Sequence, residues 1–210
     1  MTKRTRTLVP ILDAAHGVEV PGKCSPDKSH KEYEWSRVIL SILADELTHH
    51  GFRVEFTNTA ENEIGLSKRK NIANSIKCST GQIKFLLSLH NNAAGCDNNW
   101  HSARGIEIYT SKGQTLSDKF AEVIFDNFKQ DFPTLEGFKY RVDTTDNDND
   151  KESNFTVLMG SSYSAVLIEW LFQDNLKDLG LLKCPLINDR LVKSLVKSLI
   201  YIDEHINEFI

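Results

Sequence analysis

Three apolar stretches of this 210-residue sequence each lead into a side chain that can bind a metal ion or carry a proton. These side chains are His16, His90 and Glu169. Short apolar runs bounded by polar residues predict buried strands. In open α/β sheets, ligands gather outside the carboxyl ends of the strands. We therefore expect the three side chains to converge at one edge of a sheet.

Two imidazoles and one carboxylate form the His₂Glu ligand set of hydrolytic zinc sites, in which water takes the fourth position. The chemistry also needs a second carboxylate, outside the ligand set, to accept a proton from that water. Besides Glu169, Glu32 and Glu34 are candidates, because both lie in the first turn of a predicted helix. A carboxylate there also has a structural explanation, since it offsets the helix dipole by about 0.3–1 kcal/mol. The spacing includes no H-E-x-x-H helix and does not by itself assign the roles.

The segments that must position these residues alternate between strand and helix patterns. Alternating or continuous apolar runs predict strands at Leu8–Leu12, Arg53–Thr57, Phe85–Leu89, Gly105–Thr110, Thr156–Met159 and Ala165–Glu169. Apolar residues at helical spacing predict helices over 31–51, 66–76, 114–128 and 191–209, with a shorter helix following Trp170. This alternation predicts an α/β fold: a single domain over residues 1–210, with a twisted, mostly parallel or mixed sheet of about five to six strands flanked by helices on both faces.

Two polar segments, 95–104 and 143–153, interrupt this alternation and are predicted to be loops. The second is rich in aspartate, and a calcium site formed by Asp146, Asp148 and Asp150 is one interpretation of it. The glycine and the terminal glutamate of the known calcium-loop pattern are missing, however. We therefore predict a solvated loop here.

The composition excludes several classes of function. A net charge of −4 gives no long-range attraction to nucleic acid. No apolar stretch approaches the roughly 20 residues of a membrane span. The basic start of the chain is followed by too short an apolar run for a signal peptide. A nucleotide-binding sheet domain is disfavoured because neither glycine-rich phosphate loop is present.

Short motifs surround the candidate residues in a fixed order along the chain. They are D-x-x-H-G at 13–17, L-x-x-R-x-x-x-A-N at 66–74, S-x-H-x-N-A at 88–93, G-x-E at 105–107 and E-x-x-F-x-x-N-x-x-D at 169–178. In this combination the chain, from about Leu8 to Leu182, resembles the zinc-dependent N-acetylmuramoyl-L-alanine amidases. This is the type 3 peptidoglycan amidase family, which is also found in phage endolysins.

The resemblance implies a role for each candidate. Zn²⁺ would be held by His16, Glu32 and His90, and Glu169 would be the general base. Glu32 fits the family's ligand better than Glu34, judged by its distance from the glycine that ends the helix. The bond cut would be the amide between N-acetylmuramic acid and the L-alanine of the stem peptide.

The sequence also departs from the family pattern. Ala14 and Ala15 replace the proline and glycine that precede the first histidine, and Leu171 replaces a glycine two residues after the catalytic glutamate. A proline that often precedes the last strand is absent. These changes leave the site residues intact but bear on how the substrate is bound.

The biological role expected from the resemblance is that of a phage or prophage endolysin without a separate cell-wall-binding domain. Such a protein is made in the cytoplasm without a signal peptide and acts on the wall after its release. We expect a monomer that binds the peptidoglycan stem and neither nucleic acid nor, by insertion, a membrane. A bacterial wall-remodelling amidase is the alternative, and so is a metal-free relative that binds peptidoglycan or a partner.

Five other residues keep two interpretations each. His30 is close enough in sequence to Glu32 to compete as a ligand, and His101 is either solvent-facing or in contact with substrate. Glu107 is expected to be on the surface or to support the site from outside the ligand set. Trp170 is expected to pack in the core, with sugar stacking as the alternative. Arg141 is either exposed or a partner for a stem-peptide carboxylate.

Overall fold

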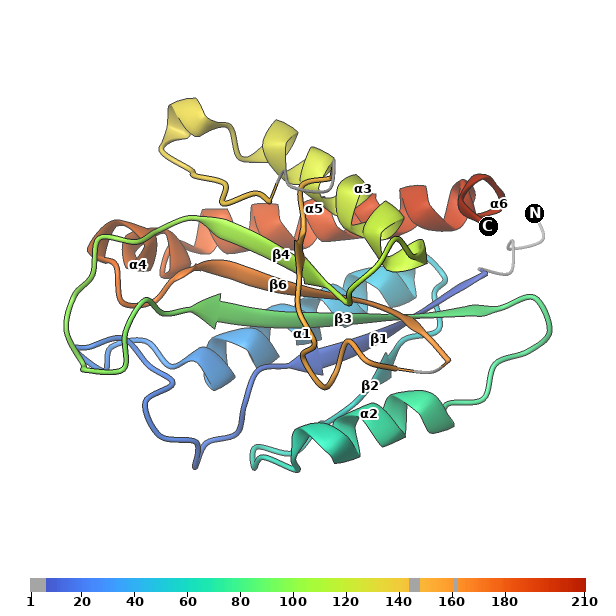
Figure 1. Ribbon diagram of the computed structural model, residues 1–210, viewed down its shortest axis with the longest axis horizontal. Helices are drawn as coiled ribbons and strands as arrows, with labels where there is room; N and C mark the ends of the chain where they lie inside the picture. The colour runs from blue at the N-terminus through green and yellow to red at the C-terminus, as the bar shows by residue number, and fades with distance from the viewer. Residues whose placement is uncertain (1–6, 144–147, 161) are drawn as a thin grey trace.

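A six-stranded sheet forms the centre of the computed structural model, which describes residues 7–143, 148–160 and 162–210 (Figure 1). The strand order is β2-β1-β3-β6-β4-β5. The strands are β1 (Leu8–Ala14), β2 (Glu55–Phe56), β3 (Ile83–Asn92), β4 (Ile106–Thr110), β5 (Lys151–Glu152) and β6 (Ser164–Phe172). All neighbouring strands are parallel except β4 and β6, which are antiparallel. The sheet is therefore mixed and mostly parallel.

The three central strands are buried because other parts of the protein cover the sheet on both faces. Leu12 on β1 pairs with Leu87 on β3, which in turn pairs with Val166 on β6. All three side chains are inaccessible to solvent. Continuous apolar runs of this kind are typical of parallel strands covered on both sides. The arrowheads of β1, β3 and β6 point the same way in Figure 1, so their carboxyl ends meet at one edge.

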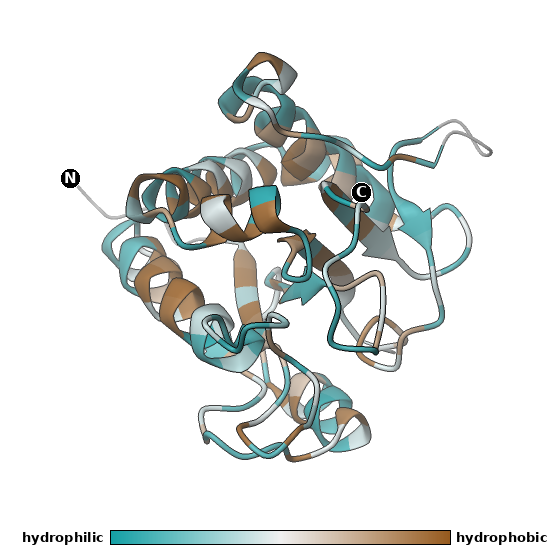
Figure 2. Ribbon diagram, turned by 90° about the vertical axis from the view of Figure 1, so that its left-hand side faces the viewer, coloured by the Kyte–Doolittle hydropathy of each residue, from teal (hydrophilic) through white to brown (hydrophobic). Residues whose placement is uncertain are grey.

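Helices α1 (Glu32–His49), α3 (Leu116–Asp131) and α5 (Pro185–Glu204) cover one face of the sheet, with α1 and α5 passing behind the strands in Figure 1. Their apolar stripes form the main hydrophobic core with alternate residues of the central strands. Helix α2 (Leu66–Ser75) and the segment before β6 cover the other face, where a smaller core includes Ala73 and Val157. The helices carry hydrophobic and hydrophilic bands side by side (Figure 2).

The C-terminal part of the chain contains two short helices, α4 (Leu176–Leu182) and α6 (Ile206–Phe209). A 3-10 turn spans Thr134–Glu136. Asn175 caps α4, because its side chain accepts hydrogen bonds from the first backbone N–H groups of the helix. None of the helices in the described part of the chain is long and apolar enough to span a membrane.

The α/β class, the mixed sheet and the helices on both faces confirm the sequence prediction. The strand predicted at Thr156–Met159 is wrong, because this segment is a turn in which Val157 and Leu158 are both buried. Strand alternation would send one of them to the other side. The predicted closing helix begins earlier, at Pro185, since proline suits the first helical turn.

The aspartate-rich loop also differs from its prediction. Its end forms β5, which pairs with β4 through Tyr109 and Lys151. Asp150 is only 1% exposed, so the prediction of a solvated loop is wrong at this residue. Asp146 lies outside the described residues. The remaining polar loop, 95–104, forms no helix or strand.

Candidate active site

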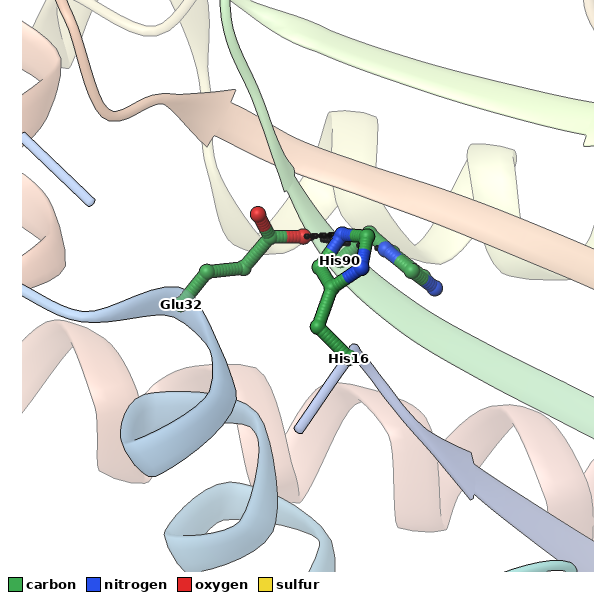
Figure 3. A group of neighbouring side chains, drawn as sticks. All are labelled: His16, Glu32 and His90. Carbon is green, nitrogen blue, oxygen red and sulfur yellow. Dashed lines mark hydrogen bonds and ion pairs between the residues drawn. The ribbon is translucent and has the colours of Figure 1, made fainter. Parts of the chain in front are cut away.

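His16, Glu32 and His90 converge at the carboxyl edge of the central strands (Figure 3). His16 follows β1, Glu32 begins α1, and His90 lies near the end of β3. The Oε1 atom of Glu32 is 2.9 Å from Nδ1 of His90 and 3.3 Å from Nε2 of His16. One donor atom from each of the three residues lies within 4.8 Å of the others. The structure therefore brings together the three predicted ligands.

The carboxylate of Glu32 is held in place from several directions. It is 2% exposed, and its Oε1 atom accepts a hydrogen bond from the backbone N–H of Asn91. The side chain of Gln173 donates to Oε2 at 3.1 Å. Burial alone would raise the pKa of Glu32, but hydrogen bonds from His16 and His90 outweigh it and lower the pKa. Glu32 is therefore an ionised carboxylate with a fixed orientation.

The contact between Glu32 and His90 has the opposite effect on the pKa of His90. Burial works against its charged form, but the hydrogen bond to Glu32 and the negative charges of Glu32, Glu169 and Asp13 together outweigh burial and raise the pKa of His90. The two imidazole rings stand edge to face with centroids 5.0 Å apart. His16 is the more accessible of the pair, with a side chain 21% exposed.

The turn that carries His16 has an unusual backbone and is secured by two arginines. His16 has a φ of 46°, in the left-handed region. Its carbonyl oxygen accepts hydrogen bonds from Arg37 at 2.9 Å and from Arg69 at 3.0 Å. At Gly17 a Cβ atom would lie 2.0 Å from the backbone nitrogen of Glu63, so only glycine fits there. The turn is thus fixed by its own sequence and by both arginines.

Arg69 is itself buried and anchors this turn to the sheet. Its guanidinium donates to Asp13 at 3.1 Å and also bonds the carbonyl of Ala14. Asp13 accepts further hydrogen bonds from Thr57 and Ser88. A buried charge is tolerated when it is paired and hydrogen-bonded in this way. Arg69 therefore holds the turn that carries His16 against the end of β1.

Glu169 lies on β6 directly opposite His90 in the strand register. Its Oε2 atom is buried and has no hydrogen-bond partner among the described residues. Burial, with repulsion from Glu32 and Glu107 and only partial relief from His90, raises the pKa of Glu169 to about 8. A carboxylate in this position is suited to exchange protons near neutral pH.

A β-bulge follows Glu169. Between His90 and Asn92 the register of β3 with β6 shifts, so β6 contains one extra residue. Leu171 lies in this bulge with a φ of 64°. Bulges of this kind favour glycine at the left-handed position and occur next to active sites. The glycine of the family pattern thus has a physical reason, which Leu171 meets at a cost in backbone strain.

Glu107 lies across from Glu169 on the neighbouring strand and is buried. It pairs with Lys151 at 2.8 Å and with Arg141, and it accepts a hydrogen bond from Asn92 at 2.7 Å. Burial opposes ionisation, but these hydrogen bonds lower the pKa of Glu107. The prediction that Glu107 lies on the surface is wrong, whereas its place beside the ligand set agrees with the alternative. Arg141 is partly exposed and occupied by this pair.

A cleft of about 540 Å³ opens over the cluster. His16, Glu32, His90 and Glu169 contribute to its floor. The loop after β1, the loop after β3 and the segment Asn154–Val157 form its walls. Lys23 is the only lysine or arginine among the described lining residues. The cleft therefore has the volume of a ligand site with one cationic group on its wall.

The remaining candidates lie outside the cluster. Glu34 is on the surface, where it pairs with Lys31 at 2.8 Å. The imidazole of His30 is buried and bonds Asn91 instead of joining the ligand set. His101 pairs with Asp97 in the polar loop. Trp170 is fully buried in the main core, which confirms packing and excludes sugar stacking.

Asn91 and Gln173 were not identified from the sequence. Gln173 bonds Glu32, and the side chain of Asn91 bonds His30 and the carbonyl of Trp170. The only sequence signal was that each follows a strand that ends at a candidate residue. Their roles depend on the convergence of α1, β3 and β6, which no local pattern encodes.

Comparison with protein families gives a match over residues 11–201 to the model described as N-acetylmuramoyl-L-alanine amidase. The chain belongs to this amidase family. The peptidoglycan amidase activity of the family is therefore also that of this chain, and the cleft is the place where the four candidate residues of the amidase meet. A search among curated proteins gives no match for this sequence.

Solved structures show the same fold. The N-acetylmuramoyl-L-alanine amidase from Clostridium difficile 630 has a TM-score of 0.74 at 22% identity, over 94% of this amidase and 97% of that chain. Ami1 from Mycobacterium smegmatis has a TM-score of 0.75 at 16% identity, over 95% and 98%. The catalytic domain of the CD27L endolysin targeting Clostridia difficile has a TM-score of 0.61 at 21% identity, over 93% and 97%.

Proposed function

We propose that this amidase hydrolyses the bond between N-acetylmuramic acid and L-alanine with the help of a zinc ion. In this proposal His16, Glu32 and His90 hold the zinc, and Glu169 is the general base. The observation that carries the proposal is the convergence of one donor atom from each proposed ligand within 4.8 Å. Glu169 stands opposite His90 with an unpartnered oxygen.

The chemistry of the donor set fits zinc. Imidazole nitrogens and a carboxylate oxygen are ligands that zinc prefers, and three protein ligands leave a position open for catalysis. The support of Glu32 by Gln173 resembles the outer hydrogen bonds that orient metal ligands. When bound, zinc supplies a Lewis acid that polarises the scissile carbonyl and activates water for attack near neutral pH.

Glu169 performs the proton transfers. Its carboxylate accepts a proton from the attacking water and then donates it to the nitrogen of the leaving L-alanine. A base works best when its pKa lies near the operating pH, and burial of Glu169 moves its pKa from the acidic range toward neutrality. The carboxylate is fixed by β6, while its Oε2 atom stays without a competing hydrogen bond.

The cleft supplies the binding surface for the substrate. The walls contain amide side chains such as Asn99, the aromatic ring of Phe155 and the ammonium group of Lys23. Amide groups suit the polar glycan and peptide backbone, and a cation suits a stem-peptide carboxylate. We assign Lys23 to that contact because it is the only lysine or arginine among the described cleft residues.

The biological role that we propose is that of a phage or prophage endolysin, made in the cytoplasm and released to the wall as a monomer. The similarity to the CD27L catalytic domain supports this role. A bacterial remodelling amidase is the second candidate, favoured by the higher TM-scores of the bacterial enzymes. Expression in a host with and without membrane permeabilisation separates the two roles, because an endolysin lyses cells only when it reaches the wall.

The decisive experiment is digestion of purified peptidoglycan followed by mass spectrometry. We expect new free L-alanine amines on intact glycan strands. Glu169→Gln keeps the shape of the side chain and is expected to lower kcat by about 10²–10⁴-fold while zinc stays bound. The matched control is Glu34→Gln, a surface change near the site that leaves kcat unchanged.

Metal analysis completes this test. His90→Ala is expected to lose zinc and activity together. If the wild-type protein binds peptidoglycan but neither binds zinc nor releases L-alanine, the chain is a metal-free binding relative and the proposal is wrong. Full hydrolysis by Glu169→Gln would refute the assignment of the base and leave the zinc ligands standing.

A further inference from the structure

A second group of ligand-type side chains lies away from the catalytic residues. Asp118 in the first turn of α3 meets Asp148 and Asp150, which precede β5. One carboxylate oxygen from each lies within 4.8 Å of the others. Asp118 and Asp150 are buried, with Asp150 only 1% exposed. Three carboxylates in such a small, mostly dry volume repel one another unless a positive charge joins them.

The described hydrogen bonds to Asp118 and Asp150 come from neutral groups, the hydroxyls of Thr110 and Thr115 and the backbone N–H of Thr115. The Thr110 hydroxyl lies 2.7 Å from Asp150 Oδ2 and 3.0 Å from Asp118 Oδ1. A hydroxyl has one hydrogen, so it can donate to only one of these oxygens. The other oxygen of Asp150, Oδ1, is buried without a hydrogen-bond partner among the described residues. Neither Asp118 nor Asp150 forms an ion pair with another described residue.

We propose that Asp118, Asp148 and Asp150 form a calcium-binding site, separate from the catalytic ligands, that orders one wall of the cleft. An all-oxygen, all-anionic donor set selects a hard cation. Ligand oxygens lie about 2.3–2.6 Å from Ca²⁺ and can therefore be up to about 5 Å apart, which accommodates the observed spacing without rearrangement.

The position of the group connects it to the cleft. Asp150 is followed by Lys151, which pairs with Glu107 beside the catalytic residues. The segment Asn154–Val157, which begins four residues after Asp150, lines the cleft. A cation that joins Asp150 to Asp118 would tie the start of this segment to α3, and Thr110 ties it to the end of β4. Calcium would thus restrain the wall without touching the substrate.

The test is calorimetric titration of the zinc-loaded protein with Ca²⁺, together with thermal unfolding. We expect a single site with a Kd of about 10⁻⁵–10⁻³ M. At about ten times Kd, the Tm should rise by about 3–6 °C. Hydrogen exchange should slow in residues 148–157 and stay unchanged in α1. Mg²⁺ at the same concentration should give a smaller rise, because it demands a tighter octahedral shell.

Asp150→Asn removes one ligand charge and keeps the side-chain shape. It should abolish the calcium-dependent rise in Tm, and without calcium it should be at least as stable as the wild type, since it relieves repulsion. Asp126→Asn is the control for α3, because it removes an exposed carboxylate from the same helix and leaves all three proposed ligands. It should keep the calcium effect, and so should Glu32→Gln, which alters only the proposed catalytic cluster.

Three results would overturn the proposal. They are no binding heat up to about 10 mM Ca²⁺, which exceeds the weakest natural sites, an undiminished calcium effect in Asp150→Asn, or an effect that disappears in Glu32→Gln. The last would place the calcium at the catalytic ligands. None of these results would bear on the zinc proposal, whose readouts are zinc content and release of L-alanine.

Discussion

The two clusters of candidate metal-binding side chains in this protein differ in how their negative charges are balanced. In the proposed catalytic cluster, Glu32 accepts hydrogen bonds from two histidines, Asn91 and Gln173, so its charge is offset inside the protein. In the aspartate cluster, the described hydrogen bonds come from neutral groups of Thr110, Gln114 and Thr115, and Oδ1 of Asp150 is buried without a hydrogen-bond partner among the described residues. The charge of Glu32 is thus offset within the protein, whereas Asp118 and Asp150 form no ion pair with another described residue.

This difference shows how ligand chemistry and folding are connected. Mixed imidazole and carboxylate ligands can bond one another before a metal arrives, so the site can be preorganised at little cost in stability. Carboxylates alone cannot do so, and their cluster depends on a proton or a cation for its stability. We therefore expect changes around the catalytic cluster to have large effects regardless of added cations.

The largest effect is expected from the buried pair beneath His16. Arg69→Met keeps the volume of the side chain but leaves the Asp13 carboxylate buried without its cation. Breaking such a pair costs about 3–5 kcal/mol, which urea unfolding at pH 7 would measure. The control is Arg53→Met, which removes a half-exposed pair with Glu55 and should cost no more than about 1 kcal/mol. Equal losses would show that the catalytic turn is not specially anchored.

A smaller effect is expected from the hydrogen bond that orients Glu32. Gln173→Met preserves the buried volume and removes the donor to Oε2. Loss of such an orienting partner weakens metal affinity by about 10–100-fold, measured by competition with a chromogenic zinc chelator. Gln130→Met, on the exposed end of α3, is the control and should bind zinc like the wild type. Unchanged affinity in a folded Gln173→Met protein would mean that Glu32 is positioned by its histidine contacts alone.

The smallest effect concerns acid sensitivity. Glu63 accepts two hydrogen bonds from Arg69 and one from the backbone of Gly65. Burial opposes ionisation, but these bonds lower the pKa of Glu63 below its usual value. A lowered pKa stabilises the fold above the unfolded value of about 4.3, and this contribution disappears as the pH falls through the folded pKa.

Glu63→Gln should therefore destabilise the protein by about 1–2 kcal/mol at pH 7, and the difference from wild type should shrink below about pH 4. Unfolding curves across this range provide the measurement. Glu61→Gln, two residues earlier and exposed, should track the wild type at every pH. A difference for Glu63→Gln that grows toward acid would contradict the assignment of an ionised, arginine-paired carboxylate.

The sequence was informative wherever function depends on the end of a strand or a helix. His16 follows β1, while His90 and Glu169 lie near the carboxyl ends of β3 and β6, and parallel strands bring such ends together. The choice of Glu32 over Glu34 agrees with the structure because the first residue of α1 faces the sheet while Glu34 faces solvent. These are consequences of local periodicity and strand direction, which sequence patterns describe well.

The parts that were not predicted depend on contacts between distant segments. The aspartate-rich loop gave a calcium hypothesis with Asp146 as a member, but the structure supplies Asp118 from another element. Patterns of adjacent residues cannot identify a ligand on a helix elsewhere in the chain. Thr156–Met159 was assigned to a strand from its apolar content, although its burial comes from packing under the sheet. Tertiary burial and strand propensity produce the same residue types.

Leu171 constrains how this sequence can evolve. A glycine there would relieve about 1–2 kcal/mol of left-handed strain, yet it would also delete a fully buried leucine, and emptying such a position costs about 2–5 kcal/mol. The single substitution is therefore unfavourable, even though glycine suits the backbone. A change to glycine would be favourable only after a neighbouring core residue has become larger and can fill the vacated volume. The two positions are epistatic, and the order in which they change is determined by the packing.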